Sequence, residues 1–185
     1  MKTIGNYIKC IPASDEPLSA DVYLIEGEQY CYIFDVGNCR ESLQVIREVQ
    51  KEKIIILSHH HKDHTGNIDQ LDYKKLYVGD VTAETIGTGI VVREPVFIRD
   101  GIDFEIIPCV SPHTGGSLIV IVNYEYTLIA DLFFSRPPID TKAARNMIQT
   151  LETVDTGFFV VSHSGEGSIY EKQNLISQLY DYFQV

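Results

Sequence analysis

The amino-acid sequence predicts an α/β protein whose sheets are covered by helices. Short, fully apolar runs at 54–57 and 158–161 are typical of strands that are buried on both faces. Segments with one apolar face at helical spacing, of which 40–51 is the clearest, separate the strands. Strands, helix, strand and helix follow one another twice, so the chain repeats one pattern in two halves. We find no linker and no low-complexity stretch, and we expect one domain over residues 1–185.

The first half of the chain is expected to begin with an edge strand over 3–10 and a turn-rich link over 12–17. A hairpin should follow, with strands at 22–25 and 30–34 joined by a turn at Gly27 and Glu28. The next expected elements are a helix over 40–51, a strand over 54–57, a helical turn over 68–71, a strand over 76–78 and a short helix over 82–86.

The second half of the chain is expected to be richer in strands. Strands are predicted at 91–92, 96–98 and 104–107, followed by a hairpin of 117–122 with 126–130, a helix over 141–151 and a strand over 158–161. The final segment, 169–183, carries four apolar residues on one helical face, namely Leu175, Ile176, Leu179 and Phe183.

The charge of the chain argues against some classes of partner. The formal net charge is −11, and no basic run is longer than Lys74 and Lys75. Nucleic acids and anionic membranes select clustered Lys and Arg, so we expect neither as a partner. No apolar run is long enough to span a membrane. We expect a small-molecule substrate instead, bound in a pocket that is either shallow or completed by the second subunit of a homodimer.

The cysteines indicate a reducing environment. The chain has four, Cys10, Cys31, Cys39 and Cys109, and none forms a C-x-x-C pair of the kind that holds structural zinc. The stretch from Met1 to Tyr7 leads into polar sequence without the apolar core of a secretory signal. We therefore expect free thiols and a cytoplasmic location.

One segment, from Ser58 to Gly66, concentrates metal-binding side chains directly after an apolar strand. Its metal-binding side chains are His59, His60, His61, Asp63 and His64, in the spacing H-x-H-x-D-H. Imidazoles this close would repel one another if protonated, and a bound cation holds them neutral. His59 and His61 would point the same way in an extended chain, while Asp63 and His64 follow a bend. The segment can therefore offer ligands to two neighbouring metal ions.

A solvated loop or a tag-like nickel-binding run is the simpler alternative. A tag would lie at a terminus, whereas this run lies in mid-chain and contains an aspartate. We favour the metal site.

Three isolated residues at strand ends could join the cluster. His113 lies in a glycine-rich loop, Asp131 follows the strand 126–130 and His163 follows the strand 158–161. Alone, each would be an ordinary loop or cap residue. Together they weigh more, because the chain has six histidines and both of those outside the cluster lie where sites of layered α/β folds gather. The set suits zinc, and also iron or manganese.

Taken in order, these residues resemble the metallo-β-lactamase fold superfamily, and within it the glyoxalase II-like hydrolases. The resemblance is carried by Asp35-Val36-Gly37, the H-x-H-x-D-H element, His113 followed by Thr-x-Gly-Ser, Asp131 and His163. It spans residues 35 to 165, most of the chain. It implies a short, single-domain member with a four-layer αβ/βα sandwich, two mixed sheets flanked by helices and the site at one edge.

The same resemblance implies a role for each site residue. The first metal ion would be held by His59, His61 and His113, and the second by Asp63, His64 and His163, with Asp131 bridging the two. Asp35 would support the cluster from behind the metal-bound imidazoles. From the sequence alone, a turn aspartate before Gly37 explains Asp35 equally well.

The chain departs from the family pattern around the ligands. Ala130 stands where a glycine is usual before the bridging aspartate, and Ser162 and Ser164 replace the glycines that flank the last histidine. Asn67 replaces the second glycine after the cluster. All seven ligand positions are kept, so these changes bear on loop geometry. His60 occupies the variable position between ligands, and we interpret it as exposed or supporting rather than as a ligand.

The chemistry expected from this ligand set is hydrolysis. Two divalent metal ions, zinc in the first instance, would share a water, lower its pKa and supply a bridging hydroxide near neutral pH. Asp63 would orient the hydroxide and relay its proton. The substrate would be a small ester, thioester, lactone or phosphodiester. No substrate-binding residue can be named, because ordinary surface positions are the better interpretation of Arg136, Tyr170 and His60.

Two alternatives stay open. An iron-dependent oxidoreductase, such as a sulfur dioxygenase, would use the same ligands, because His and Asp suit iron as well as zinc. A non-catalytic metal-binding module is the other. A β-lactamase is disfavoured by aspartate at position 131, and a transfer-RNA-processing nuclease by the acidic charge. A flavodiiron reductase is disfavoured because His61 stands where that family has glutamate.

Overall fold

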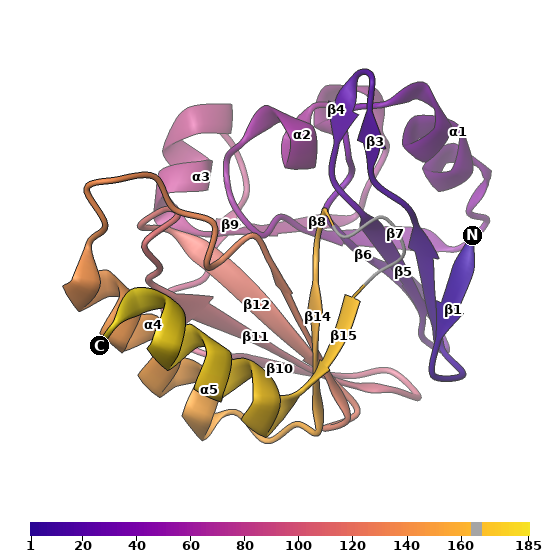
Figure 1. Ribbon diagram of the computed structural model, residues 1–185. Coiled ribbons are helices and arrows are strands. Elements are labelled where there is room, and N and C mark those ends of the chain that lie inside the picture. The colour runs from indigo at the N-terminus through magenta and orange to yellow at the C-terminus, as the bar shows by residue number, and fades with distance from the viewer. Residues whose placement is uncertain (164–167) are drawn as a thin grey trace.

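The computed structural model describes residues 1–163 and 168–185, which form two mixed sheets packed face to face with helices on both outer sides (Figure 1). This is the four-layer αβ/βα arrangement that the resemblance implied. The fold-class prediction is therefore confirmed.

The first sheet carries the N-terminal half of the chain. Its order is β1 (Lys2–Ile4), β2 (Ile8–Ile11), β5 (Val22–Glu26), β6 (Tyr30–Phe34), β7 (Glu52–Ile56), β8 (Lys75–Val78) and β9 (Ile90–Val91). The strands from β1 to β6 pair antiparallel, and those from β6 to β9 pair parallel. A separate small hairpin joins β3 (Ser14–Asp15) to β4 (Leu18–Ser19).

The second sheet carries the C-terminal half. Its order is β10 (Val96–Arg99), β11 (Asp103–Cys109), β12 (Ser117–Val122), β13 (Tyr126–Ala130), β14 (Phe158–Val161) and β15 (Ser168–Glu171). The only parallel pair among these strands of the described chain is β13 with β14. The parallel strands of both sheets thus have their carboxyl ends at the same edge of the sandwich, where the loops that follow these strands meet.

The helices cover the outer faces. The first sheet carries α1 (Arg40–Glu48), α2 (Lys62–Thr65), a 3₁₀ turn (Ile68–Gln70) and α3 (Asp80–Ile86), and the second carries α4 (Thr141–Thr153) and α5 (Lys172–Phe183) (Figure 1). A side chain caps the start of α4: the carboxylate of Asp140 accepts hydrogen bonds from the N–H groups of Lys142 and Ala143 at 3.0 and 2.9 Å.

The strands are continuous apolar runs in the sequence because successive side chains point to opposite faces of the sheet and both faces are covered. In β6, Tyr32 and Phe34 face the second sheet, while Cys31 and Ile33 face the helices. The ring of Tyr32 stacks at a tilt on Phe104 of the other sheet, with centroids 4.2 Å apart. Each inner strand is therefore covered on both faces, by a sheet on one side and by helices on the other.

Some element boundaries differ from the sequence prediction. The single edge strand expected over 3–10 is a hairpin of β1 and β2, and the link expected over 12–17 contributes to the β3–β4 hairpin. The segment 169–183 does not begin as a helix: its first residues belong to β15, which pairs antiparallel with β14 and extends the second sheet.

All four cysteines are buried free thiols, as expected. Among the described residues, no helix is long and apolar enough to cross a membrane.

Candidate metal centre

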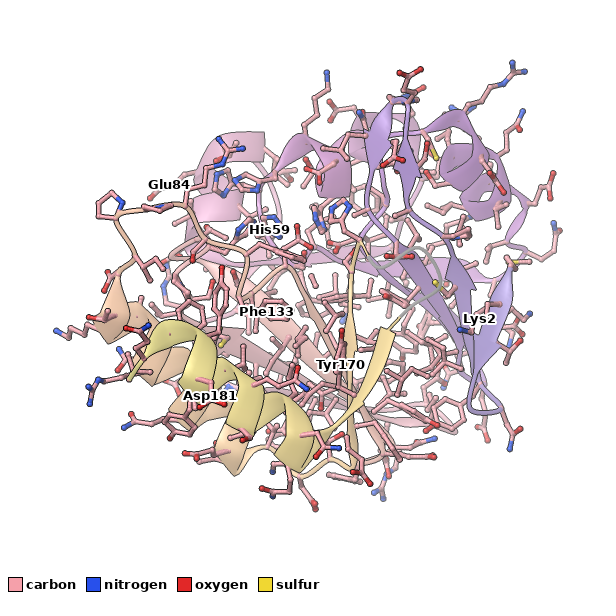
Figure 2. The ribbon with its side chains drawn as sticks, viewed as in Figure 1. Lys2, His59, Glu84, Phe133, Tyr170 and Asp181 are labelled. Carbon is pink, nitrogen blue, oxygen red and sulfur yellow. The ribbon has the colours of Figure 1, made fainter. Side chains whose placement is uncertain are left out.

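The seven residues predicted as metal ligands lie together at one edge of the sandwich. Asp35 follows β6, the histidine cluster follows β7, Asp131 follows β13 and His163 follows β14. The loop that holds His113 is brought to the same edge because the N–H of Leu118 donates to the carbonyl of Ser58 at 2.7 Å, across the two sheets. His59 lies where the two halves of the sandwich meet (Figure 2).

The first group consists of three imidazoles that converge on one point. Nε2 of His59 lies 3.1 Å from Nδ1 of His61 and 3.2 Å from Nε2 of His113. The third side of the triangle, from His113 Nε2 to His61 Nδ1, is 3.1 Å. Three ring nitrogens at such distances form one face of a tetrahedral site. The sequence prediction that His59 and His61 point the same way agrees with this geometry.

The second group adds carboxylates. Its members are Asp63, His64, Asp131 and His163, whose nearest nitrogen or oxygen atoms all lie within 4.8 Å of one another. Asp63 Oδ2 lies 2.9 Å from Nε2 of His163, and Asp131 Oδ2 lies 3.3 Å from Nε2 of His64. The single turn of α2, which begins after His61, rotates Asp63 and His64 away from the first group.

A buried network orients two of the imidazoles. Asp35 Oδ2 lies 2.7 Å from Nδ1 of His64 and accepts a hydrogen bond from the Ser58 hydroxyl at 2.8 Å. The Ser58 oxygen in turn lies 2.9 Å from Nδ1 of His59. With Nδ1–H bonded on each ring, Nε2 points into the cluster, where a metal ion would bind it, as metal-bound histidine requires. The resemblance implied this place for Asp35, whereas no sequence pattern indicated Ser58.

A backbone carbonyl orients His113. Its Nδ1 donates to the carbonyl oxygen of Phe134, and the N–H of Phe134 donates to the carbonyl of Asp131 at 3.0 Å. The turn after β13 therefore connects a residue of the first group to one of the second. No sequence signal could have indicated this contact, because a main-chain carbonyl is present at every residue.

The two groups differ in electrostatics. Burial, followed by the charges of neighbouring imidazoles, lowers the pKa values of His59 and His61. Burial also lowers the pKa of His64, but the carboxylates of Asp35 and Asp131 outweigh it and raise this pKa to about 10. A hydrogen bond to Asp63 raises the pKa of His163. Burial thus favours the neutral form of His59 and His61, whereas the second group concentrates negative charge that attracts a cation.

Two buried atoms in the second group lack a hydrogen-bond partner among the described residues. They are Nε2 of His64 and Oδ1 of Asp131. Leaving a buried polar group unpaired costs roughly 1–3 kcal/mol. A metal ion would satisfy both atoms, and imidazole with carboxylate is a donor set that zinc, iron and manganese accept. The residues present therefore fit a pair of metal ions.

An open pocket of about 860 Å³ lies over the cluster. Five of the predicted ligands line it, namely His61, Asp63, His113, Asp131 and His163. The exposed side chains of Leu18, Phe134 and Tyr182 give the pocket an apolar part, and Arg136 also lines it. A cavity of this size suits a small-molecule substrate.

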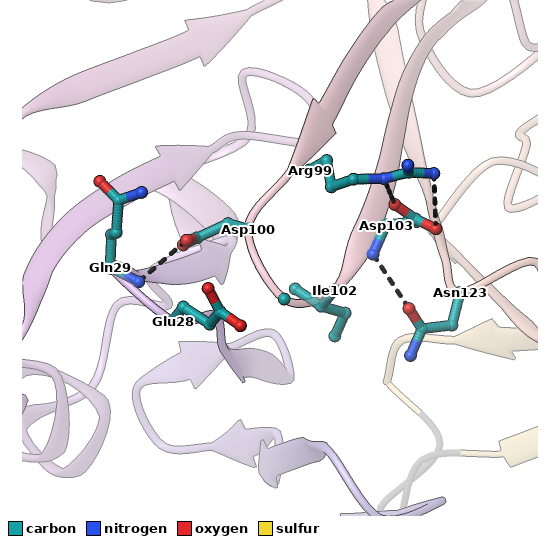
Figure 3. A pocket seen from close by; sticks show the side chains of 8 residues that line it. Glu28, Gln29, Arg99, Asp100, Ile102, Asp103 and Asn123 are labelled. Atoms are coloured by element: carbon teal, nitrogen blue, oxygen red, sulfur yellow. Dashed lines mark hydrogen bonds and ion pairs between the residues drawn. The ribbon is translucent and has the colours of Figure 1, made fainter.

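A second pocket lies at the opposite edge of the sandwich, where the β5–β6 and β10–β11 turns meet (Figure 3). Its buried carboxylate, Asp100, accepts hydrogen bonds from the N–H groups of Gln29 and Tyr30 at 2.9 and 3.0 Å. Asp103 pairs with Arg99. These groups satisfy one another, so this pocket is structural in character.

Comparison with known proteins agrees with the geometry. The model of the metallo-beta-lactamase superfamily matches residues 15–86. A metallo-beta-lactamase from Pontibacter korlensis has a TM-score of 0.74 at 16% identity, over 99% of this chain and 97% of that one. An archaeal metallo-beta-lactamase superfamily protein from Sulfolobus tokodaii has a TM-score of 0.66 at 17% identity, over 96% and 86%.

The chain has the metallo-β-lactamase fold. A mutant of a flavo di-iron protein from Thermotoga maritima is also similar, with a TM-score of 0.69 at 12% identity. That match covers 95% of this chain but 62% of the other, so the chain spans less than two thirds of that protein. No curated protein matches the sequence significantly.

The departures from the usual metallo-β-lactamase pattern have local explanations. Ala130 has φ of 46°, the left-handed region that favours glycine. Asn67 lies outside the left-handed region, with φ of −94°. Its side-chain amide donates hydrogen bonds to the carbonyls of Val36 and Cys39 at 3.0 Å. It thereby ties the loop after the cluster to the loop after β6. Ser164 lies outside the described residues.

The three residues considered for substrate binding fall in different places. Arg136 lines the pocket of this metallo-β-lactamase fold. Tyr170 packs against the core beneath α5. His60 belongs to neither ligand group, and its Nδ1 lies 3.4 Å from the hydroxyl of Thr114.

Proposed function

We propose that this protein is a hydrolase that binds two divalent metal ions, one in each ligand group. The observation that carries the proposal is the convergence of two ligand groups beside one pocket, with two buried ligand atoms, His64 Nε2 and Asp131 Oδ1, left without a hydrogen bond. The first ion would be held by His59, His61 and His113 and the second by Asp63, His64 and His163, with Asp131 bridging. We assign zinc, with iron or manganese as the alternatives.

When bound, the two ions would polarise a carbonyl or phosphoryl oxygen and make a water acidic enough to attack near neutral pH. The protein's own contribution is to hold the reacting groups. His59, His64 and His113 are oriented through Nδ1, so their Nε2 atoms need no rearrangement to bind.

Asp63 would also serve in catalysis. Its carboxylate lines the pocket and is partly exposed. Burial raises the pKa of Asp63, but the hydrogen bond from His163 and the charge of His64 outweigh it, so the net shift is downward. An ionised carboxylate in this place can orient the attacking water and accept its proton.

The pocket supports a small substrate with an apolar part and a negative charge. Leu18, Phe134 and Tyr182 offer apolar contact, and Arg136 offers a guanidinium. The reactive bond would be an ester, thioester, lactone or phosphodiester. The protein as a whole carries a formal net charge of −11. Against that background, the guanidinium of Arg136 beside the cluster gives the pocket a strong local preference for an anionic group.

The first test is elemental analysis of protein purified without a tag and without added metal. About two zinc or manganese ions per chain, the number that two ligand groups hold, would support the proposal. Activity on esters, thioesters, lactones, β-lactams and phosphodiesters would then be measured for the wild type and for a variant with both His61→Ala and Asp131→Ala. Loss of metal and of hydrolysis is expected, while His60→Ala, the matched control in the same segment, should retain both.

Other outcomes would redirect the proposal. Full hydrolysis by the double variant would exclude the metal-dependent reaction. Iron near one per chain, with an optical band that responds to oxygen or thiols, would favour an iron-dependent oxidoreductase on the same ligands. Failure to bind any metal on titration would overturn the hydrolase and favour the non-catalytic alternative.

A further inference from the structure

A buried carboxylate outside both ligand groups is bonded to the segment that carries His163. Asp21 is fully buried and directly precedes β5 in the first sheet. Its Oδ2 accepts a hydrogen bond from the backbone N–H of His163 at 2.8 Å, across a sequence separation of 142 residues. This bond therefore joins the start of β5 to the end of β14 in the other sheet.

Ser162 forms a second connection between the same two segments. The N–H of Asp21 donates to the Ser162 hydroxyl oxygen at 3.1 Å, and that hydroxyl lies 3.3 Å from Oδ2 of Asp21. The hydroxyl can thus accept one bond and donate the other. A serine at the position where the family usually has glycine supplies a contact that glycine could not make.

The other carboxylate oxygen anchors Asp21 to the N-terminal strands. Its Oδ1 accepts a hydrogen bond from the N–H of Ala13 at 3.0 Å, and the thiol of Cys10 lies 3.6 Å away. Both oxygens of Asp21 therefore face donors. An asparagine at position 21 would place its NH₂ group, itself a donor, opposite one of these donors. Only a carboxylate can therefore accept all of these hydrogen bonds.

The backbone of His163, to which Asp21 is bonded, has a strained conformation that its surroundings must stabilise. His163 has φ of 58°, a conformation that a non-glycine residue keeps only when its surroundings fix it. Its Nε2 lies 2.9 Å from Asp63 Oδ2 and 3.4 Å from Asp131 Oδ2. A shift of the main chain at this residue would move the imidazole out of the second ligand group.

We propose that Asp21 is a positioning residue, which sets the second metal site by fixing the backbone of His163. The proposal rests on the proposed function, because it requires a metal ion at that site. Asp21 reaches His163 through the main chain, whereas Asp35 and Ser58 act on the rings of His64 and His59. Loss of Asp21 should therefore weaken the second site and spare the first.

The chain offers a matched control for this test. Asp100 is also buried, and its two carboxylate oxygens also accept hydrogen bonds from main-chain N–H groups. The donors are Gln29, whose bond is drawn in Figure 3, and Tyr30. It lies at the opposite edge of the sandwich from the metal ligands. Asp21→Asn and Asp100→Asn thus remove the same chemistry, but only the first removes it next to a ligand.

The experiment is a titration of the metal-free, full-length protein with Co²⁺, followed by visible absorption and by calorimetry. Wild type should bind two ions. In Asp21→Asn the affinity of the second site should fall roughly 10–100-fold, with the first site within about threefold of wild type. Asp100→Asn should lose stability but keep both affinities within about threefold. Ser162→Ala, which leaves the carboxylate in place, should lose roughly threefold to tenfold at the second site.

The outcomes separate this inference from the proposed function. If wild type binds no second ion, both are overturned. If wild type binds two ions and Asp21→Asn binds them with unchanged affinities, or weakens both sites equally, only the positioning role is overturned. If Asp21→Asn does not fold, Ser162→Ala decides, and unchanged second-site affinity in that variant overturns the role.

Discussion

Nδ1 of His64 lies 2.7 Å from Oδ2 of Asp35, and both side chains are buried. The same carboxylate accepts from the N–H and the hydroxyl of Ser58, at 2.7 and 2.8 Å, and Ser58 contacts His59. One carboxylate therefore orients an imidazole in each ligand group. This arrangement couples the two sites through protein atoms.

Replacing Asp35 should weaken metal binding and also destabilise the fold. In Asp35→Asn, one oxygen of the carboxylate becomes an NH₂ group that faces donors, and the charge that balances His64 is lost. We expect a loss of roughly 3 kcal/mol or more in the unfolding free energy of the metal-free protein. Metal affinity should fall roughly 10–100-fold. Urea denaturation and Co²⁺ titration measure the two effects, and Asp103→Asn, at an exposed ion pair, should change stability by less than about 1 kcal/mol.

The two metal sites should respond differently to pH. Burial lowers the pKa of His64, but the carboxylates of Asp35 and Asp131 raise it by more, so that the pKa is about 10. At any pH below this value, a metal ion must displace a proton from His64 in order to bind. The pKa of His163 is also raised, by its hydrogen bond to Asp63. His59 and His61 have lowered pKa values and are already neutral at pH 7. Affinity at the second site should therefore rise with pH, about tenfold per unit for each proton released.

Acidification should consequently remove the second metal ion first. Samples dialysed at pH 8, 7 and 6 and then analysed for zinc should fall from about two ions per chain towards about one. If the first site empties first, or both empty together, the electrostatic difference between the groups does not control occupancy.

Close packing at Gly79 should make the first site sensitive to a single methyl group. A Cβ atom at this residue would lie 2.0 Å from the carbonyl oxygen of Gly116, in the loop between His113 and β12. We expect Gly79→Ala to cost roughly 1–3 kcal/mol of stability and to weaken metal binding by His113. Gly115→Ala, in the same loop, meets no atom within 4 Å and should change stability by less than about 0.5 kcal/mol. Thermal unfolding with and without zinc distinguishes the two, and equal melting temperatures would contradict the argument.

The pairing of ligands within the histidine cluster could be predicted from the sequence because it follows from local geometry, whereas the places of His113, Asp131 and His163 were implied only by the family resemblance. His59 and His61 are two residues apart in an extended segment, and Asp63 and His64 follow the turn of α2. The apolar runs likewise predicted strands that are covered on both faces. Local pattern was less informative at the N-terminus, where alternation continues through the turn at Gly5, whose φ is 56°.

The contacts that orient the ligands could not be predicted in the same way. Asp21 meets His163 only because the two sheets pack in one register, and the carbonyl of Phe134 carries no sequence signal. The sequence position of Arg136 predicts only an ordinary surface residue, because it says nothing of the pocket that Arg136 lines. Such long-range relationships are fixed by tertiary packing, which a single sequence does not display.

Arg136 supplies a prediction about substrate preference. It shares the pocket with His61 and His163, in a protein whose formal net charge is −11. A guanidinium in this place should bind a carboxylate or phosphate of the substrate equally in the ground state and the transition state. For an anionic substrate, Arg136→Ala should therefore raise KM roughly tenfold with kcat little changed.

The controls for this prediction vary both the residue and the substrate. Arg136→Lys keeps the charge but loses the two-pronged geometry, so it should restore part of the affinity. A neutral substrate of similar shape should show the same KM in all three proteins, because no charged group is there to be recognised. Raising the salt concentration should narrow the difference in KM between wild type and Arg136→Ala. Arg136 is exposed, so salt screens its attraction for the anionic substrate. A fall in kcat with KM unchanged would instead place Arg136 in contact with the reacting bond.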